Sequence, residues 1–265
     1  LPPGKNGTRR RLLRRRRAPR GSTRLEHRHF AAACRTPPVR AVSMPLPPPG
    51  IILRDARTPR GFVQLLASSS PLPPGPSAAA QCHGLATKLG LAASNVFAGT
   101  ALLAFYCRCR RPGDARRLFD EMPERSGVTW SALVYGHARS SAPGLAVEAF
   151  GSMVRAGFSP TAAAVSSALV ACARMEDARV GAMIHAAGLK CGSSVCGSVV
   201  VRTALVDMYA KCRDVSAAQR VLEEMEEKNV ATFTALVGGF ASAGRPCEAM
   251  VLVREMEQSG VAPNM

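Results

Sequence analysis

Nine cysteines and five histidines are the residues of this chain best suited to hold a metal ion or act as nucleophiles. No two cysteines have the Cys-x-x-Cys spacing of zinc sites, and Cys107 and Cys109 are too close together for an ordinary zinc knuckle. The sequence also lacks the His-x-Glu that, with Cys-x-x-Cys, holds zinc and activates water in nucleobase deaminases. We therefore expect no metal, no cofactor and no catalytic residue, and we do not expect an enzyme.

Several of these residues instead recur about a hundred positions apart. Residues 96–109 return as 199–212, and residues 128–136 return as 231–239. The equivalent positions are occupied by Cys109 and Cys212, by His83 and His185, and by Trp130 and Phe233. Self-similarity at a fixed period is typical of repeat architectures. We expect the cysteines to be small buried residues, the histidines to be structural, and Trp130 and Phe233 to belong to the core.

Inside each unit the apolar spacing is that of a helix. The three-and-four spacing, which places apolar groups on one helix face, is found in Leu102, Leu103 and Tyr106, and again in Ala115, Leu118, Phe119 and Met122. Asp114 and Asp214 suit a helix start, whereas Pro160 and Pro263 prevent a helix from continuing. The pattern predicts an all-α chain, an α-solenoid of antiparallel helix pairs from about residue 60 to the end. One pair cannot bury its apolar face alone, so each must stack on its neighbours.

The charge of the chain is uneven. Residues 1–60 hold fifteen Arg and one Lys against Glu26 and Asp55, whereas the remainder holds nineteen basic and sixteen acidic residues. The net charge of +17 therefore belongs to the leader and does not itself indicate nucleic-acid binding. We expect residues 1–59 to be a disordered, basic, Pro-rich leader: either an organelle transit peptide, or an artefact of the gene model if translation starts at Met44. No apolar run approaches the roughly 20 residues that span a bilayer, so no membrane partner is expected.

Four strings give the chain a family resemblance. They are residues 205–212 (Leu-Val-Asp-Met-Tyr-Ala-Lys-Cys), 118–125 (Leu-Phe-Asp-Glu-Met-Pro-Glu-Arg), 128–134 (Val-Thr-Trp-Ser-Ala-Leu-Val) and 169–172 (Leu-Val-Ala-Cys). Together they resemble the plant pentatricopeptide repeat family, and within it the PLS subclass, in which ordinary, long and short motifs alternate. The resemblance covers residues 60–265 and suggests an N-terminal fragment. It implies a superhelix that reads single-stranded RNA at one base per repeat.

The motif lengths of that subclass divide the chain into six units. We expect a degenerate long motif over 60–95, a short one over 96–126, an ordinary one over 127–161 and a long one over 162–198. A second short motif then covers 199–229 and a second ordinary one 230–264.

The resemblance also implies which residues bind RNA: the fifth and the last of each short or ordinary motif. The resulting pairs are Thr100 with Ser126, Ser131 with Thr161, Thr203 with Asn229, and Thr234 with Asn264. In the family Thr with Asn favours adenine, whereas Ser126 and Thr161 depart from the usual Asn or Asp and should discriminate poorly. The long motif, with Ser166 and Ser198, is expected to act mainly as a spacer.

The function expected from this resemblance is sequence-selective RNA binding in a plant organelle, the mitochondrion or alternatively the chloroplast. The RNA-bound protein would guide cytidine-to-uridine editing, either with a deaminase or other editing factors acting in trans or with a deaminase-like domain carried by a full-length version of the chain. Two alternatives remain open at this point. One is a role in splicing or stability of an organellar RNA. The other is a protein-binding scaffold like the tetratricopeptide repeats, although those have a uniform length near 34 residues.

Overall fold

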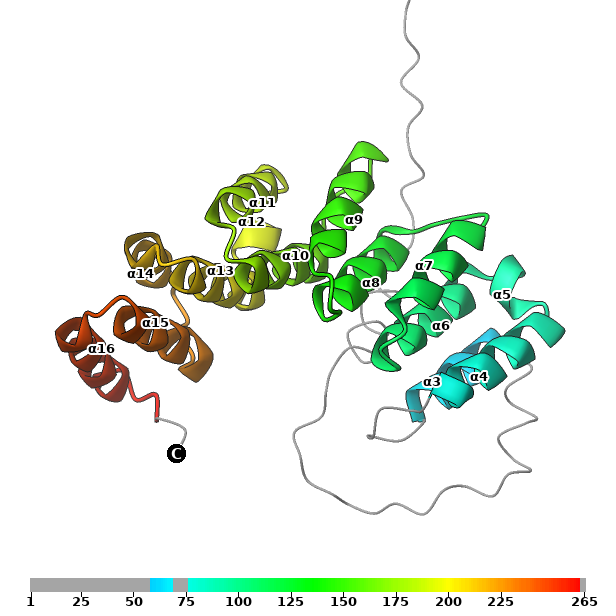
Figure 1. Ribbon diagram of the computed structural model, residues 1–265, viewed down its shortest axis with the longest axis horizontal. Helices are drawn as coiled ribbons and strands as arrows, with labels where there is room; N and C mark the ends of the chain where they lie inside the picture. The colour runs from blue at the N-terminus through cyan, green and yellow to red at the C-terminus, as the bar shows by residue number, and fades with distance from the viewer. Residues whose placement is uncertain (1–57, 69–75, 263–265) are drawn as a thin grey trace, which may run out of the picture.

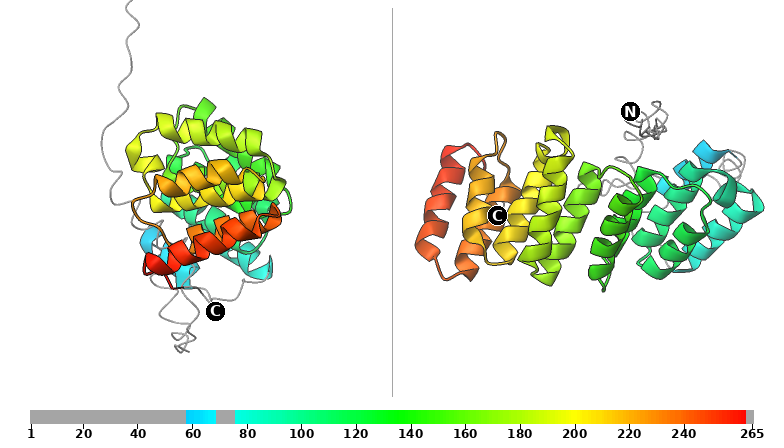
Figure 2. Two further views of the ribbon diagram at one scale, coloured as in Figure 1. Left: turned by 90° about the vertical axis from the view of Figure 1, so that its left-hand side faces the viewer. Right: turned by 90° about the horizontal axis from the view of Figure 1, so that it is seen from above.

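The computed structural model describes residues 58–68 and 76–262, so most of the leader, Pro263 and Asn264 lie outside the described residues. Every regular element in these two stretches is a helix, which confirms the predicted all-α class. The helices lie side by side in one curved row that runs from α3 at one end to α16 at the other (Figures 1 and 2). This arrangement is the predicted α-solenoid.

The row has two layers. The inner layer contains α3 (Pro59–Ser68), α6 (Val96–Arg108), α8 (Gly127–Ala138), α10 (Ala162–Met175), α13 (Val199–Lys211) and α15 (Val230–Ser242), and each of these helices packs on the next. The outer layer contains α4 (Pro76–Lys88), α7 (Pro112–Glu121), α9 (Gly144–Arg155), α11 (Ala178–Lys190), α14 (Val215–Glu223) and α16 (Pro246–Gln258). From α6 onward each inner helix packs on the outer helix that follows it. Two single-turn helices, α5 (Leu91–Ser94) and α12 (Ser193–Cys196), precede α6 and α13.

The core lies between the two layers and runs the length of the row. Leu102, Leu103, Leu118 and Phe119 are all at most 3% exposed, as their helical spacing predicts. Trp130 (7%) and Phe233 (0%) are likewise buried, which confirms their prediction as core residues. Of the two equivalent cysteines, Cys109 is buried but Cys212 is only half-buried.

Two equivalent glycines let neighbouring inner helices approach closely. A Cβ atom on Gly136 would lie 2.0 Å from the Cys107 Sγ of α6, and one on Gly239 would lie 2.8 Å from the Ala210 Cβ of α13. Both distances are shorter than a real carbon contact, so these positions require glycine for packing. The repeat therefore encodes the spacing of the inner layer as well as its apolar face.

Most inner helices begin at a side chain that caps them. Asn95, Ser126, Thr161 and Asn229 each accept a hydrogen bond from the backbone N–H three residues on, the standard N-cap geometry. Asp214 caps α14 in the same way, as predicted. Asp114 does not cap α7, because Pro112 starts that helix two residues earlier and places the aspartate in the first turn.

The two recurring histidines make equivalent contacts. The Nδ1 atom of His83 lies 2.7 Å from the Tyr106 hydroxyl, and that of His185 lies 3.2 Å from the Tyr209 hydroxyl. Each bond joins an outer helix to the inner helix that follows it in the chain. The pairs therefore fasten successive units together in the same way at both places.

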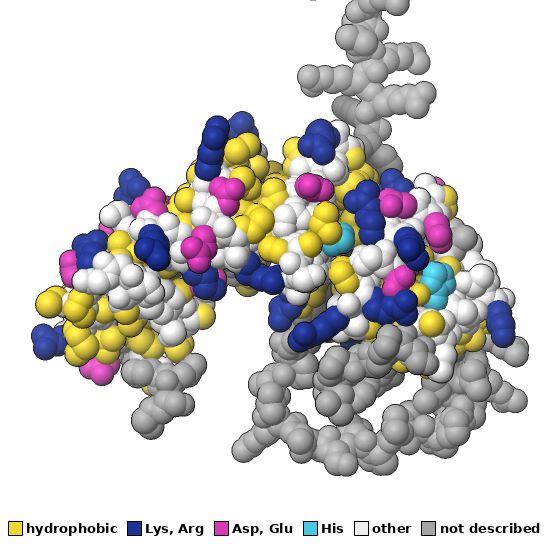
Figure 3. All heavy atoms as spheres, in the orientation of Figure 1, with side chains coloured by type: hydrophobic (Ala, Val, Ile, Leu, Met, Phe, Trp, Pro, Cys, Tyr) yellow, Lys and Arg dark blue, Asp and Glu magenta, His cyan; other side chains and the backbone are white. Residues whose placement is uncertain are grey.

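Figure 3 shows basic and acidic side chains interspersed over the face in view, in keeping with the nearly balanced charge of the repeats. None of the helices at 58–68 and 76–262 is long and apolar enough to cross a membrane. Among the same residues no three His, Cys, Asp or Glu side chains gather as metal ligands would.

Candidate nucleic-acid interface

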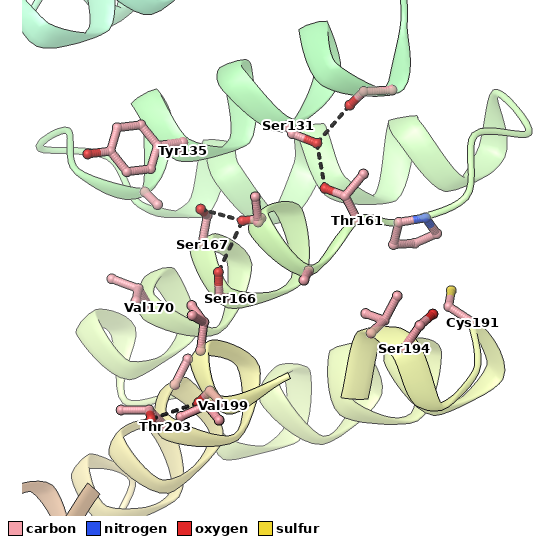
Figure 4. A pocket seen from close by; sticks show the side chains of 18 of the residues that line it. Ser131, Tyr135, Thr161, Ser166, Ser167, Val170, Cys191, Ser194, Val199 and Thr203 are labelled. Carbon is pink, nitrogen blue, oxygen red and sulfur yellow. Dashed lines mark hydrogen bonds between the residues drawn. The ribbon is translucent and has the colours of Figure 1, made fainter. Parts of the chain in front are cut away.

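A groove of about 1490 Å³ runs over the inner helices α8, α10, α13 and α15, and the end of α11 with α12 forms part of its wall. Its lining includes five of the eight residues predicted to bind RNA: Ser126, Ser131, Thr161, Thr203 and Asn229. Ser166 of the predicted spacer motif also lines it, and Figure 4 shows how Ser131, Thr161, Ser166 and Thr203 lie around it. Polar side chains that are spread from residue 126 to residue 229 in the sequence therefore line one surface of the folded chain.

Ser131 and Thr161 form the first pair in the groove. Their hydroxyl oxygens lie 2.8 Å apart, although 30 residues separate them in the chain. Ser131 also donates to the Gly127 carbonyl at 2.7 Å, so Thr161 must donate to Ser131. Both hydroxyl protons are consumed inside the protein, which leaves this pair only lone pairs to offer a ligand.

Thr203 and Asn229 form the second pair. The Asn229 side-chain amide donates to the Thr203 hydroxyl at 3.3 Å, and Thr203 donates to the Val199 carbonyl at 2.8 Å. The Asn229 Oδ1 accepts the Thr232 backbone N–H at 2.9 Å, which fixes the orientation of the amide, because only an oxygen can accept that proton. One amide N–H of Asn229 is left over, so this pair offers a hydrogen-bond donor.

Thr100 and Ser126 are not in direct hydrogen bond. Both meet Thr129 instead: the Thr100 and Thr129 hydroxyls lie 2.7 Å apart, and those of Ser126 and Thr129 lie 3.0 Å apart. Thr100 is only 6% exposed and Thr129 is fully buried, whereas Ser126 is half-buried and reaches the groove. The threonine of the predicted first short motif therefore keeps its hydroxyl inside the protein.

The last predicted pair is only half described. Thr234 is exposed and donates to the Val230 carbonyl at 2.7 Å, but it is not part of the groove lining. Asn264 lies outside the described residues.

The structure adds groove residues that the sequence reasoning missed. The apolar side chains of Val128, Val170, Val199 and Val200 lie among the polar pairs, and Val200 is 63% exposed. Val128 lies three residues before Ser131, and Val200 lies three residues before Thr203. This shared spacing could have identified both valines from the sequence. The groove also contains two cations, Arg139 and Lys190, and one carboxylate, Asp207, which forms an ion pair with Lys211 at 2.8 Å.

A curved two-layer row of helix pairs with a polar groove along its inner layer defines the class of helical-repeat solenoids. Comparison with known sequences is more specific. The sequence profile described as PPR repeat matches residues 100–126, 128–158, 200–230 and 231–261. The chain belongs to the pentatricopeptide repeat family.

Curated relatives and solved structures agree with this assignment. The chain is 33% identical over 183 residues to pentatricopeptide repeat-containing protein At1g11290, chloroplastic, of Arabidopsis thaliana, a match covering 69% of this chain and 22% of the relative. It is also 33% identical over 182 residues to At2g03380, mitochondrial, of the same organism, covering 69% and 26%. The fold is similar to that of the pentatricopeptide repeat protein PPR10 in complex with an 18-nt psaJ RNA element. That match has a TM-score of 0.52 and 22% identity, and it covers 77% of this chain and 35% of that one.

These coverages differ greatly between the two sides. Across eight curated relatives the chain spans between 21% and 39% of the relative's length. The comparison therefore concerns a run of repeats and not the whole of each relative.

Proposed function

We propose that the inner groove binds single-stranded RNA and that Thr203 and Asn229 read one base in it. The observation that carries this proposal is the contact between the two predicted partners across 26 residues of sequence, inside a groove that also holds Ser131 and Thr161. Repeat proteins of this kind read single strands because an unstacked base exposes its hydrogen-bonding edge to two or three side chains. The RNA element in the PPR10 complex is consistent with this reading of the fold.

The two groove pairs differ in what they offer a base. Asn229 presents an amide N–H, which suits a base with an acceptor on its edge, and the family resemblance narrows that base to adenine. Ser131 and Thr161 present lone pairs only, and Ser131 is 2% exposed. We expect the 131–161 pair to discriminate poorly and the Ser166 surface to act as a spacer.

The division into short, ordinary and long motifs is part of the same proposal, as is membership of the PLS subclass. It is supported by the starts of five inner helices: α6, α8, α10, α13 and α15 begin at residues 96, 127, 162, 199 and 230, the first residue of the five motifs proposed from residue 96 onward. From the family resemblance we further propose that the whole protein acts in cytidine-to-uridine editing of organellar RNA, with a deaminase supplied in trans or carried by a longer version of the chain. The names of the relatives include both chloroplastic and mitochondrial proteins, so the proposal covers both organelles.

Selection from a randomised RNA pool tests the proposal. The 265-residue chain should enrich single strands over duplexes and should enrich adenine at one position. The enrichment should shrink with a Thr203→Val, Asn229→Ala double variant. Equal binding of duplex and single strand, or no RNA retained at moderate salt, would contradict RNA reading and favour the protein-binding scaffold.

A further inference from the structure

Tyr135 is the one aromatic side chain among the groove-lining residues that the structure describes. It lies on α8 one helical turn beyond Ser131, and Figure 4 shows its ring at the groove on the same side as Val170. The residue is half-buried, and within 58–68 and 76–262 its hydroxyl has no hydrogen-bond partner. The groove, which is lined mostly by small polar and aliphatic residues, thus holds one large aromatic ring whose hydroxyl has no partner among the described residues.

A cation lies against this ring. The guanidinium carbon of Arg139, one further turn along α8, is 5.3 Å from the ring centroid, within the range of a cation–π contact. Arg139 is exposed and also lines the groove. Aromatic rings and guanidinium planes are the two side-chain surfaces on which proteins stack unpaired bases.

Neither residue recurs at the equivalent position of α15. The equivalent of Tyr135 in α15 is Gly238, and the equivalent of Arg139 is Ser242. By contrast, the core residues keep their type, as Trp130 does with Phe233. A Cβ on Gly238 would meet nothing within 4 Å, so α15 has open space where α8 has its ring. The ring of Tyr135 is therefore not a repeated feature, although α15 is the last inner helix described and has no further inner helix beside it as α8 has α10.

The neighbouring hydroxyl pair leaves a gap in the recognition of this motif. Ser131 and Thr161 satisfy one another at 2.8 Å and keep no free proton for a base. A base at this motif can donate to the remaining lone pairs but receives no hydrogen bond from the pair, so a further contact would add affinity there. Stacking suits that purpose because every base has a π-face, whatever its hydrogen-bonding edge.

We propose that Tyr135 and Arg139 form a stacking platform that holds one nucleotide of single-stranded RNA without regard to its base. This inference rests on the proposed function, because it places a second contact in the same groove. The platform gives affinity at the first ordinary motif, whereas the Thr203–Asn229 pair gives selectivity two motifs further on. The two contributions are separable by mutation.

The loss-of-function test uses the full chain and single-stranded 10-mers of oligoadenosine and oligouridine. Tyr135→Ala should weaken binding of both oligomers by a similar factor, about fivefold to hundredfold, as expected for the loss of one stacked base. Tyr135→Phe keeps the ring and should bind within twofold of the original chain. Arg139→Ser, which installs the residue found in α15, should weaken both by about two- to fivefold.

The gain-of-function test uses the open position in α15. Gly238→Tyr should tighten binding of both oligomers, because it adds a ring at the equivalent place. A 10-mer with a single 5-iodouridine should, on irradiation, crosslink to residue 135, and mass spectrometry of the peptide identifies the position.

The outcomes separate the two proposals. If Tyr135→Ala binds as the original chain does, or if the crosslink falls elsewhere, the platform is wrong, while binding that still depends on Asn229 leaves the proposed function intact. If the original chain binds neither oligomer, both proposals fail. A loss confined to one of the two oligomers would also overturn the platform, because it would make Tyr135 a base-selective residue.

Discussion

The side-chain amide of Asn229 donates to the hydroxyl of Thr203 at 3.3 Å, while its carbonyl oxygen caps α15 through the Thr232 backbone N–H at 2.9 Å. One side chain thus caps a helix and also hydrogen-bonds a hydroxyl of the neighbouring inner helix. These two roles are carried by different atoms, the Nδ2 and the Oδ1. A substitution that keeps one atom's role and changes the other can therefore separate stability from recognition.

Asn229→Asp makes this separation. Aspartate caps a helix as well as asparagine does, so the free energy of unfolding should change by less than about 0.5 kcal/mol. The donor is replaced by a second acceptor, which suits guanine because its edge carries two adjacent N–H donors. Preference should move from adenine toward guanine at one base, measured with RNAs that differ only there.

Asn95 provides the control for that exchange. It caps α6 through the Ala98 backbone N–H at 3.0 Å but does not line the groove. Asn95→Asp should alter neither stability nor base preference. Unchanged preference in the Asn229 variant, or an equal change in both variants, would remove Asn229 from base reading.

The buried hydroxyl chain of the first short motif gives a prediction on stability. Thr129→Val removes the group that meets both Thr100 and Ser126, and it strands the Thr100 hydroxyl in the core. We expect a cost of about 1–3 kcal/mol in the free energy of unfolding, measured by urea denaturation. Thr129→Ser keeps the hydroxyl and should cost clearly less.

A double-mutant cycle shows whether the cost comes from that contact. Thr100→Val together with Thr129→Val removes both polar partners, so the pair should cost less than the sum of the two single variants. Additive costs would mean that the two hydroxyls do not stabilise one another.

The fold was largely predictable from the sequence because equivalent positions of the repeat carry residues of the same type and pack in the same way. Trp130 and Phe233 could be assigned to the core from their equivalence alone, and their burial follows. The close approach at Gly136 and Gly239 could not be predicted, because a glycine in a helix carries no sign of which neighbour it faces. The start of α7 at Pro112 shows a similar limit. Proline and aspartate both signal a helix start, and the sequence did not show which of Pro112 and Asp114 begins this helix.

The sequence predicted which residues of the candidate site lie in equivalent register, but it did not predict which of them are accessible. The family pattern identified Thr100 and Thr203 as equivalent, yet Thr100 is turned toward Thr129 and buried, whereas Thr203 faces the groove. Thr129 does not explain the difference, because its equivalent Thr232 is also a buried threonine. The two motifs differ instead at their last residue: the longer Asn229 side chain reaches the Thr203 hydroxyl, whereas Ser126 makes no bond to Thr100. Tyr135 was missed for the opposite reason, because it breaks the repeat and so stood outside every equivalence.

Two adjacent glycines in α15 give a matched pair for helix packing. Gly239→Ala should be destabilising by about 1–3 kcal/mol, because the new methyl group would lie 2.8 Å from the Ala210 Cβ and 3.2 Å from its Cα. Gly238→Ala meets nothing within 4 Å and should be stabilising by about 0.5–1 kcal/mol, the ordinary helix-propensity gain. Thermal unfolding of both variants measures the contrast. Equal effects would show that α13 and α15 are further apart than described.

His137 gives a prediction on pH. It is 3% exposed, its Nδ1 has no partner in the described part of the chain, and burial, with Arg116 nearby, holds its pKa below the usual 6.5, while Glu148 acts weakly in the opposite sense. The folded protein thus binds this proton less readily than the unfolded chain does, so stability rises with pH and is lost as pH falls below about 6.5. The equivalent residue in α15 is Phe240, also buried at 3%.

His137→Phe should therefore fold and should reduce the decline in unfolding free energy between pH 7 and 5.5, measured by urea denaturation at each pH. Part of the decline should remain, because burial also lowers the pKa of His185. A variant with the same pH dependence as the original chain would show that His137 is protonated equally well in the folded and unfolded states.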